Sequence, residues 1–275
     1  MLYVGCHLSA GAGNLEMVKV AQSIGANTFA FFTRNPRGSR AKPEDPVDCE
    51  KAVSALKEAQ FGRLVAHGAY TMNLCTAEAG AREFAASVLC DDLRRMAALP
   101  GNYYNFHPGS HVGQGVDTGI AQICDALKKA MAPDYPVTVL LETMAGKGSE
   151  IGGRFEELKA IIDGVGSDNI GVCLDSCHVH DAGYDIVNDL DGVLREFDRV
   201  IGLDKLKALH LNDSKNSFAS HKDRHELLGD GNLGLNTFRA IVNHPYLKTL
   251  PMILETPNEL PGYAREIALL RQMEQ

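Results

Sequence analysis

The chain has 275 residues, 45% of them hydrophobic, and a formal net charge of −8. This length fits one large domain or two small ones, with ample apolar content for a core. No apolar run approaches the roughly 18 residues that span a bilayer, and no basic segment precedes the first apolar run, so we expect neither a membrane protein nor a secretory signal peptide. Seven scattered cysteines, an odd number, argue against a disulfide framework and favour a cytoplasmic protein.

The acidic balance, taken alone, speaks against a nucleic-acid partner, because contacts to phosphates need lysine and arginine. Bound divalent cations would weaken that objection. They would concentrate positive charge at one place, where a phosphate group could bind even though the chain as a whole is acidic. The local charge of a site therefore decides this question, and the net charge does not.

Short apolar runs alternate along the chain with longer amphipathic stretches. The runs predict strands at Leu2–His7, Thr28–Phe32, Leu64–His67, Tyr104–His107, Val137–Glu142, Gly171–Asp175, Leu206–Leu211 and Pro251–Glu255. The stretches predict helices at Asn14–Ile24, Val47–Ala59, Ala81–Ala98, Gly119–Met131, Phe155–Val165, Leu190–Ile201, Asn236–Asn243 and Tyr263–Met273. Eight strand–helix units without a linker predict one α/β domain over residues 1–275, a (β/α)8 TIM barrel.

Nine potential metal ligands lie where these strands end or in the segments that follow. They are His67, His107, Glu142, Asp175, His178, His210, Asp223, His225 and Glu255. Active sites of such barrels form at the carboxyl ends of the strands, so these side chains are expected to meet at one mouth. Histidine and carboxylate groups are the usual ligands of zinc and similar ions.

Each of these residues has a plainer interpretation when taken alone. His107, in Asn-Phe-His-Pro-Gly, fits a structural turn, and any of the others fits a hydrogen-bonded polar group in the core. Asp175 and His178 together could serve two neighbouring ions, and Asp223 and His225 face the same side of an extended segment. The joint occurrence favours metal. Nine ligands exceed the four that zinc usually takes, so two or three ions are expected, and ions roughly 3.5–4 Å apart suit phosphate-ester hydrolysis.

Several segments resemble the endonuclease IV family of apurinic/apyrimidinic endonucleases. They begin at His67 (HGAYTMNL), Asn105 (NFHPGS), Gly171 (GVCLDSCH), Leu209 (LHLNDSK), Asp223 (DRH) and Leu254 (LET). The resemblance runs over nearly the whole chain and implies three zinc ions per chain. It implies one ion on His67, His107 and Glu142, a second on Glu142, Asp175, His210 and Glu255, and a third on His178, Asp223 and His225.

The implied activity is hydrolysis of the phosphodiester 5′ to abasic sites in double-stranded DNA, which leaves 3′-hydroxyl and 5′-deoxyribose phosphate ends. Removal of blocking groups from 3′ ends in the same site is also implied. Glu142 is the expected catalytic residue, bridging two ions and orienting the attacking water. Arg37 is expected to enter the duplex, and Tyr70 to pack beside the sugar. Alone, Arg37 also fits a solvated loop charge and Tyr70 a core aromatic.

The chain departs from the family pattern in places. Ser176 replaces a common threonine, Ala219 a common glycine, and Gly38, Ser39 and Thr71 stand where bulkier or apolar residues are common. These changes touch the rim that would distort DNA and leave the ligand set complete. Further cations on rim loops are candidates for phosphate contacts as a set, although each one alone fits an ordinary surface charge: Arg34, Arg40, Lys42, Lys147, Lys215 and Arg224.

Three more residues are predicted to have roles beside the ligand set. His7 is expected to bond to a metal ligand, Cys173 to fill the barrel interior, and Cys177 to stay outside the ligand set.

Two other functions compete with the nuclease. A sugar isomerase or epimerase on a similar barrel needs fewer ligands, and the Asp223–His225 pair argues against it. A damaged-DNA-binding protein with a degenerate site should have lost ligands. We expect a monomer that binds DNA and no membrane.

Overall fold

A closed barrel of eight parallel strands forms the centre of the computed structural model, which describes residues 1–275. The strands, in their order around the barrel, are β1 (Tyr3–Leu8), β10 (Pro251–Leu254), β7 (Leu206–His210), β6 (Ile170–Asp175), β5 (Thr138–Glu142), β4 (Tyr103–Phe106), β3 (Val65–His67) and β2 (Ala30–Phe32). The predicted (β/α)8 architecture is therefore confirmed. Each predicted strand is present with shifted ends.

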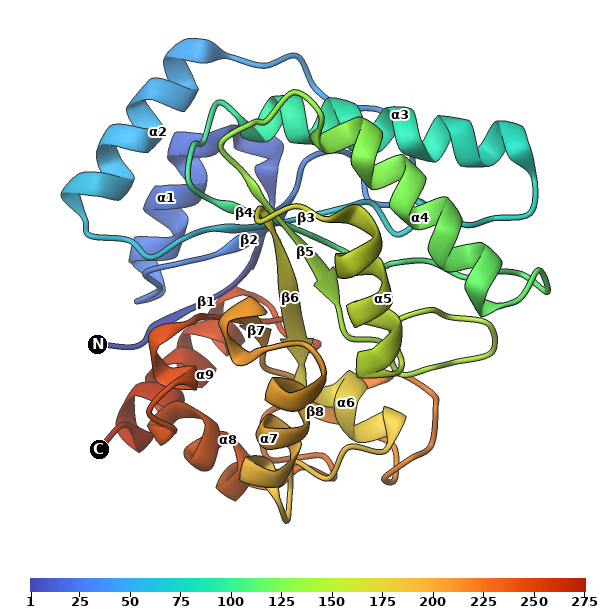
Figure 1. Cartoon of the computed structure of the whole chain (residues 1–275). Helices are drawn as coiled ribbons and strands as arrows, with labels where there is room; N and C mark the ends of the chain where they lie inside the picture. The colour runs from blue at the N-terminus through green and yellow to red at the C-terminus, as the bar shows by residue number, and fades with distance from the viewer.

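Helices surround the strands (Figure 1). They are α1 (Asn14–Ser23), α2 (Pro46–Glu58), α3 (Ala79–Met96), α4 (Val116–Met131), α5 (Phe155–Val165), α6 (Ser176–Ala182), α7 (Leu190–Val200), α8 (Gly234–Asn243) and α9 (Leu260–Met273). Short 3-10 turns lie at Ala10–Ala12, Leu203–Lys205 and Leu247–Thr249. None of the helices is both long and apolar enough to cross a bilayer. The two ends of the chain meet where the Met1 amino group lies 3.5 Å from Glu274 Oε1.

Two features of the carboxyl ends of the strands were not predicted. The first is α6, which begins directly after β6 with Asp175 as its N-cap; Asp175 Oδ1 accepts a hydrogen bond of 2.8 Å from the His178 amide. The second is a small antiparallel ribbon in the segment after β7, formed by β8 (Asp213–Ser214) and β9 (His225–Glu226). Both features carry or flank predicted metal ligands.

The barrel interior is filled by one inward residue from each of seven strands. These residues are Ala30, Val65, Tyr103, Leu140, Cys173, Ala208 and Ile253. Cys173 therefore lies in the interior, as expected. Gly5 on β1 pairs with Ile253, and a Cβ atom there would lie 1.8 Å from the Thr28 carbonyl oxygen. The close approach of the backbone explains why β1 adds no side chain at this level.

Candidate metal centre

The mouth of the barrel is lined by side chains that come two residues after the interior positions. Residues i and i+2 of a strand point to the same side, so the next inward level is fixed by the strand register. It consists of His7, Phe32, His67, Asn105, Glu142, Asp175, His210 and Glu255. Five of the nine predicted ligands belong to this level. The other four come from the segments that follow the strands: His107 after β4, His178 on α6, and Asp223 and His225 after β8.

The nine side chains lie in three adjoining groups. His67, His107 and Glu142 form one; Glu142, Asp175, His210 and Glu255 form the second; His178, Asp223 and His225 form the third. Within each group, one ligand atom per residue lies within 4.8 Å of the others. The structure thus brings all nine together, with Glu142 in two groups, and their role as metal ligands stays a prediction.

Glu142 joins the first two groups through its two oxygens. Oε2 lies 3.2 Å from His67 Nε2 and 3.5 Å from His107 Nε2, whereas Oε1 lies 3.2 Å from His210 Nδ1. The side chain is fully buried. Burial alone opposes its ionisation, but His210 and His107 hold the pKa of the Glu142 carboxyl well below its usual range. A carboxylate placed this way has an oxygen available to each of two ions.

Backbone carbonyls fix the orientation of three of the imidazoles. Nδ1 of His67 lies 2.7 Å from the Gly68 oxygen, Nδ1 of His178 lies 2.8 Å from the Thr143 oxygen, and Nδ1 of His225 lies 3.3 Å from the Glu255 oxygen. A carbonyl oxygen can only accept, so Nδ1 carries a hydrogen and Nε2 is the nitrogen left to bind a metal ion.

The Nε2 atoms of His67 and His178 face carboxylates, at 3.2 Å from Glu142 and 3.2 Å from Asp223. The buried Nε2 of His225 has no hydrogen-bond partner. Metal-binding histidines are usually oriented by a hydrogen bond from the nitrogen that does not bind the metal, as Nδ1 is here. These residues therefore fit a set of zinc ions.

Three further polar residues support the ligands. Asn105 Nδ2 donates to Glu142 Oε2 at 2.5 Å, and Asn212 Nδ2 donates to Asp175 Oδ2 at 2.7 Å while its Oδ1 accepts from the Glu255 amide at 2.8 Å. Thr143 Oγ1 accepts from the Asp175 amide at 2.9 Å. None of these three roles was predicted from the sequence. For Asn105, the signal was the period of two that places it level with His67 and Glu142.

His7 and Cys177 lie beside the ligands. His7 Nε2 is 3.4 Å from Glu255 Oε1, and its ring stacks on Phe32 with centroids 4.4 Å apart; the contact with Glu255 agrees with the expected supporting role. Cys177 is buried near Asp175 and His225. Burial, reinforced by the charge of Asp175, raises the pKa of its thiol. Its sulfur lies within 4.8 Å of ligand atoms of Asp175 and His225, and its place outside the ligand set stays a prediction.

Zinc uptake by the metal-free chain is expected to weaken as the pH falls from about 8 to about 6. Burial alone would lower the pKa of His178, but Asp175, Asp223 and Glu142 raise it well above its usual range. His178 must lose its proton to bind zinc, so affinity should drop by about tenfold per pH unit for each proton displaced. Calorimetry in two buffers of different ionisation enthalpy measures the proton release. A pH-independent affinity would contradict this expectation.

Arg37 and Tyr70 lie on neighbouring loops at the rim. The Tyr70 amide donates to the Pro36 carbonyl oxygen at 3.1 Å, which ties the segment after β3 to the loop of Arg37. Tyr70 is 58% exposed, so it is not a core aromatic. The centroid of its ring lies 5.0 Å from that of the Phe32 ring and 6.0 Å from that of the His107 ring. Arg37 is exposed as well. Both side chains are free to meet a ligand that approaches the mouth.

Arg34 is wrong as a candidate for phosphate contact. Its guanidinium is buried and donates to Asp92 Oδ1 at 2.8 Å, to Asp91 Oδ2 at 2.9 Å and to the Ser39 carbonyl oxygen at 2.7 Å. Asp92 is fully buried and also accepts from Tyr104 Oη at 2.7 Å. Arg34 therefore anchors the loop after β2 to α3, which carries Asp91 and Asp92. The other rim cations named above are exposed: Arg40, Lys42, Lys147, Lys215 and Arg224.

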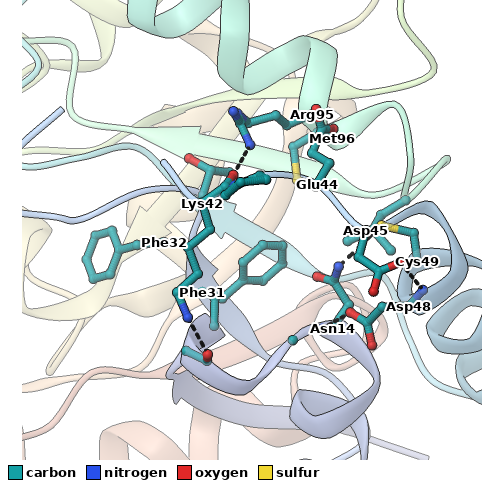
Figure 2. A pocket seen from close by; sticks show the side chains of 16 residues that line it. Asn14, Phe31, Phe32, Lys42, Glu44, Asp45, Asp48, Cys49, Arg95 and Met96 are labelled. Carbon is teal, nitrogen blue, oxygen red and sulfur yellow. Dashed lines mark hydrogen bonds between the residues drawn. The ribbon is translucent and has the colours of Figure 1, made fainter. Parts of the chain in front are cut away.

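The loop after β2 is also held by hydrogen bonds on its outer side. A cavity of about 270 Å³ lies there between α1, α2 and α3 (Figure 2). Lys42 Nζ donates to the Gly11 carbonyl oxygen, and Arg95 donates to the Lys42 carbonyl oxygen at 2.8 Å. A larger cleft of about 680 Å³ lies on the inner side, next to His7 and Phe32, and is lined by Arg40 and Lys42. Basic groups thus border an open space beside the ligand groups.

Known proteins share both sequence and fold with the chain. Residues 18–273 match the family model described as "Xylose isomerase-like TIM barrel". "Probable endonuclease 4" of Alkaliphilus oremlandii is 59% identical over 99% of this chain and 97% of that protein. The protein of the same name from Clostridium beijerinckii is 56% identical over the full length of both chains. The crystal structure of endonuclease IV from Thermus thermophilus superimposes with a TM-score of 0.86 at 35% identity, covering 98% of each chain.

Proposed function

Because the chain belongs to the endonuclease IV family, we propose that it hydrolyses the phosphodiester on the 5′ side of abasic sites in duplex DNA by means of three zinc ions. The family makes it a DNA-cleaving hydrolase. The observation that carries the finer proposal is the set of three adjoining ligand groups that share Glu142. We extend the proposal to the removal of blocking groups from 3′ ends, to action as a monomer, and to residues 1–275 as one domain.

When bound, zinc ions would supply positive charge for the phosphate and lower the pKa of a water molecule. The chain's own residues would position the water molecule and the metal ligands. Glu142 would orient the water, because its oxygens reach the first and second groups at once. Asn105 holds that carboxylate in place, and the hydrogen bonds to Gly68, Thr143 and Glu255 carbonyls hold three imidazoles. A site fixed before the substrate arrives needs little rearrangement during the reaction.

The third ligand group favours the nuclease over a sugar isomerase or epimerase. Such enzymes need fewer ligands. His178, Asp223 and His225 form an additional group that shares no residue with the first and second ligand groups. The relatives at 59% and 56% identity are named as endonucleases. A degenerate DNA-binding protein is disfavoured because all nine side chains are present and gathered.

The test is incision of a duplex oligonucleotide that carries one tetrahydrofuran abasic analogue. Zinc-loaded protein should produce a single nick directly 5′ to the lesion and leave a 3′-hydroxyl that a polymerase can extend. The same duplex without the lesion is the control and should stay intact. The absence of any nick with metal-replete protein would refute the proposal.

Replacing Arg37 by alanine is expected to weaken binding of abasic DNA by about tenfold or more, since hydrogen bonds of charged groups contribute about 1.5–3 kcal/mol. Binding is measured by fluorescence anisotropy in chains that also carry Glu142→Gln, so that the DNA stays uncut. Arg63→Ala is the matched control: Arg63 precedes β3, at the opposite end of the barrel, and lies over the Tyr103 ring at 5.0 Å. Equal losses in the two variants would show that only net charge matters.

A further inference from the structure

The loop between β8 and β9, residues 215–224, adopts an unusual backbone conformation just before two predicted ligands. Ala219, His221 and Asp223 all have positive φ angles, of 57°, 53° and 59°. Residues with a Cβ atom rarely adopt this conformation, and it persists where surrounding contacts enforce it. Asp223 is itself a member of the third ligand group, and His225 follows two residues later. Something outside the loop must hold it in this shape.

The carboxyl-terminal end of α6 provides those contacts. Each of the three residues with positive φ donates its backbone N–H to α6: Ala219 to the His180 carbonyl oxygen at 3.1 Å, His221 to the Asp181 carbonyl oxygen at 2.9 Å, and Asp223 to Asp181 Oδ2 at 3.0 Å. Two adjacent residues of one helix thus receive three alternate amides of the loop, those of Ala219, His221 and Asp223.

Asp181 has no contact with solvent, and both of its carboxylate oxygens are used on this loop and on β8. Oδ1 accepts from Ser214 Oγ at 2.7 Å, and Oδ2 accepts from Asn216 Nδ2 at 2.8 Å in addition to the Asp223 amide. A fully buried carboxylate is costly unless its oxygens are hydrogen-bonded. The full set of partners offsets that cost, and it fixes the segment at Ser214, at Asn216 and at Asp223.

We propose that Asp181 is the positioning residue of the third ligand group and sets its affinity for zinc. This inference rests on the proposed function. His178 lies on α6, one turn before Asp181, while Asp223 and His225 come from the segment that Asp181 holds. The hydrogen bond from the Asp223 amide therefore sets the distance between ligands of one group that come from different elements. Loss of a supporting residue of this kind lowers metal affinity by roughly 10- to 100-fold.

The experiment counts zinc by native mass spectrometry in the full chain, equilibrated against a series of zinc buffers. Wild-type protein should take up three zinc ions. Asp181→Ala should take up two under the same conditions and bind the third roughly 10- to 100-fold more weakly. Asp181→Asn should stay close to wild type, because its amide oxygen can replace Oδ2 and the Ser214 hydroxyl can accept from its NH2 group.

Asp92→Ala is the matched control. Asp92 is equally buried and hydrogen-bonded, but its partners are Arg34 and Tyr104, which lie outside the third group. This variant should keep three zinc ions even if it unfolds more easily. Equal loss of zinc in both alanine variants, or an unchanged third site in Asp181→Ala, would overturn the inference. A wild-type chain that never takes up a third zinc would overturn the proposed function itself, before any variant is compared.

If Asp181→Ala does not fold, Asn216→Ala gives the same information in a milder form. It removes one donor to Asp181 from a half-buried position. Binding of the third zinc should weaken severalfold, and binding of the first two should not change. An unaltered third site in a folded Asn216→Ala protein would count against the inference.

Discussion

Replacing Glu142 by glutamine is expected to slow incision of abasic DNA by ~10²-fold or more, the contribution typical of a positioned catalytic group. The two oxygens of Glu142 face four imidazole nitrogens at 3.2–3.5 Å, and Oε2 accepts from Asn105. Glutamine would turn one of these acceptors into a donor and remove the charge that both ligand groups share. DNA binding should change little, because the rim residues are untouched.

Single-turnover incision rates and fluorescence anisotropy separate the two effects. Glu266→Gln is the matched control: Glu266 is buried on α9, where it accepts from the Leu228 amide and Thr256 Oγ1, outside the three ligand groups. Its rate should stay within a few-fold of wild type. Retained incision by Glu142→Gln at more than about a tenth of the wild-type rate would remove Glu142 from its catalytic role.

Removal of metal is expected to abolish incision and to lower the temperature of unfolding. Glu142, Asp175 and Glu255 lie together in one group, and like charges in one buried site repel unless cations intervene. One ion present at about 1,000 times its dissociation constant stabilises the fold by roughly 4 kcal/mol. Since 1 kcal/mol corresponds to roughly 2–4 °C in proteins of about this size, the shift should be on the order of 10 °C.

Calorimetry before and after dialysis against a chelator measures this shift. Added zinc should restore both the unfolding temperature and incision. Added magnesium should restore neither, because five of the nine ligands are histidines and magnesium prefers oxygen. An unchanged unfolding temperature after complete removal of metal would contradict the expectation.

Much of the centre could be predicted because it follows the strand register. A strand places every second side chain on the same side, so apolar runs that end in a histidine or carboxylate already indicate one ring of polar groups. The resemblance then supplied the grouping. Asn105 follows the same period, but an amide is a less common companion of metal than a carboxylate, so the pattern alone did not predict its role.

What could not be predicted depends on contacts between distant residues. α6 is seven residues long and buried except at its last residue, so its polar residues are buried with the apolar ones and no periodic pattern of exposed and buried positions could reveal it. Arg34 looks like any loop cation until Asp92, 58 residues away, is placed beneath it. Asp181 acquires its role only when Asp223, 42 residues away, folds back onto it. Local patterns carry no information about such pairs.

We propose that the nine side chains form three adjoining metal sites that act together on a phosphodiester. The most direct test is a titration of the metal-free chain with zinc, in which bound zinc and the rate of incision at a tetrahydrofuran site are measured at each step. We expect uptake of about three zinc ions per chain, with full incision only when the third site fills. Full incision with a single bound ion, or saturation at one, would contradict the claim.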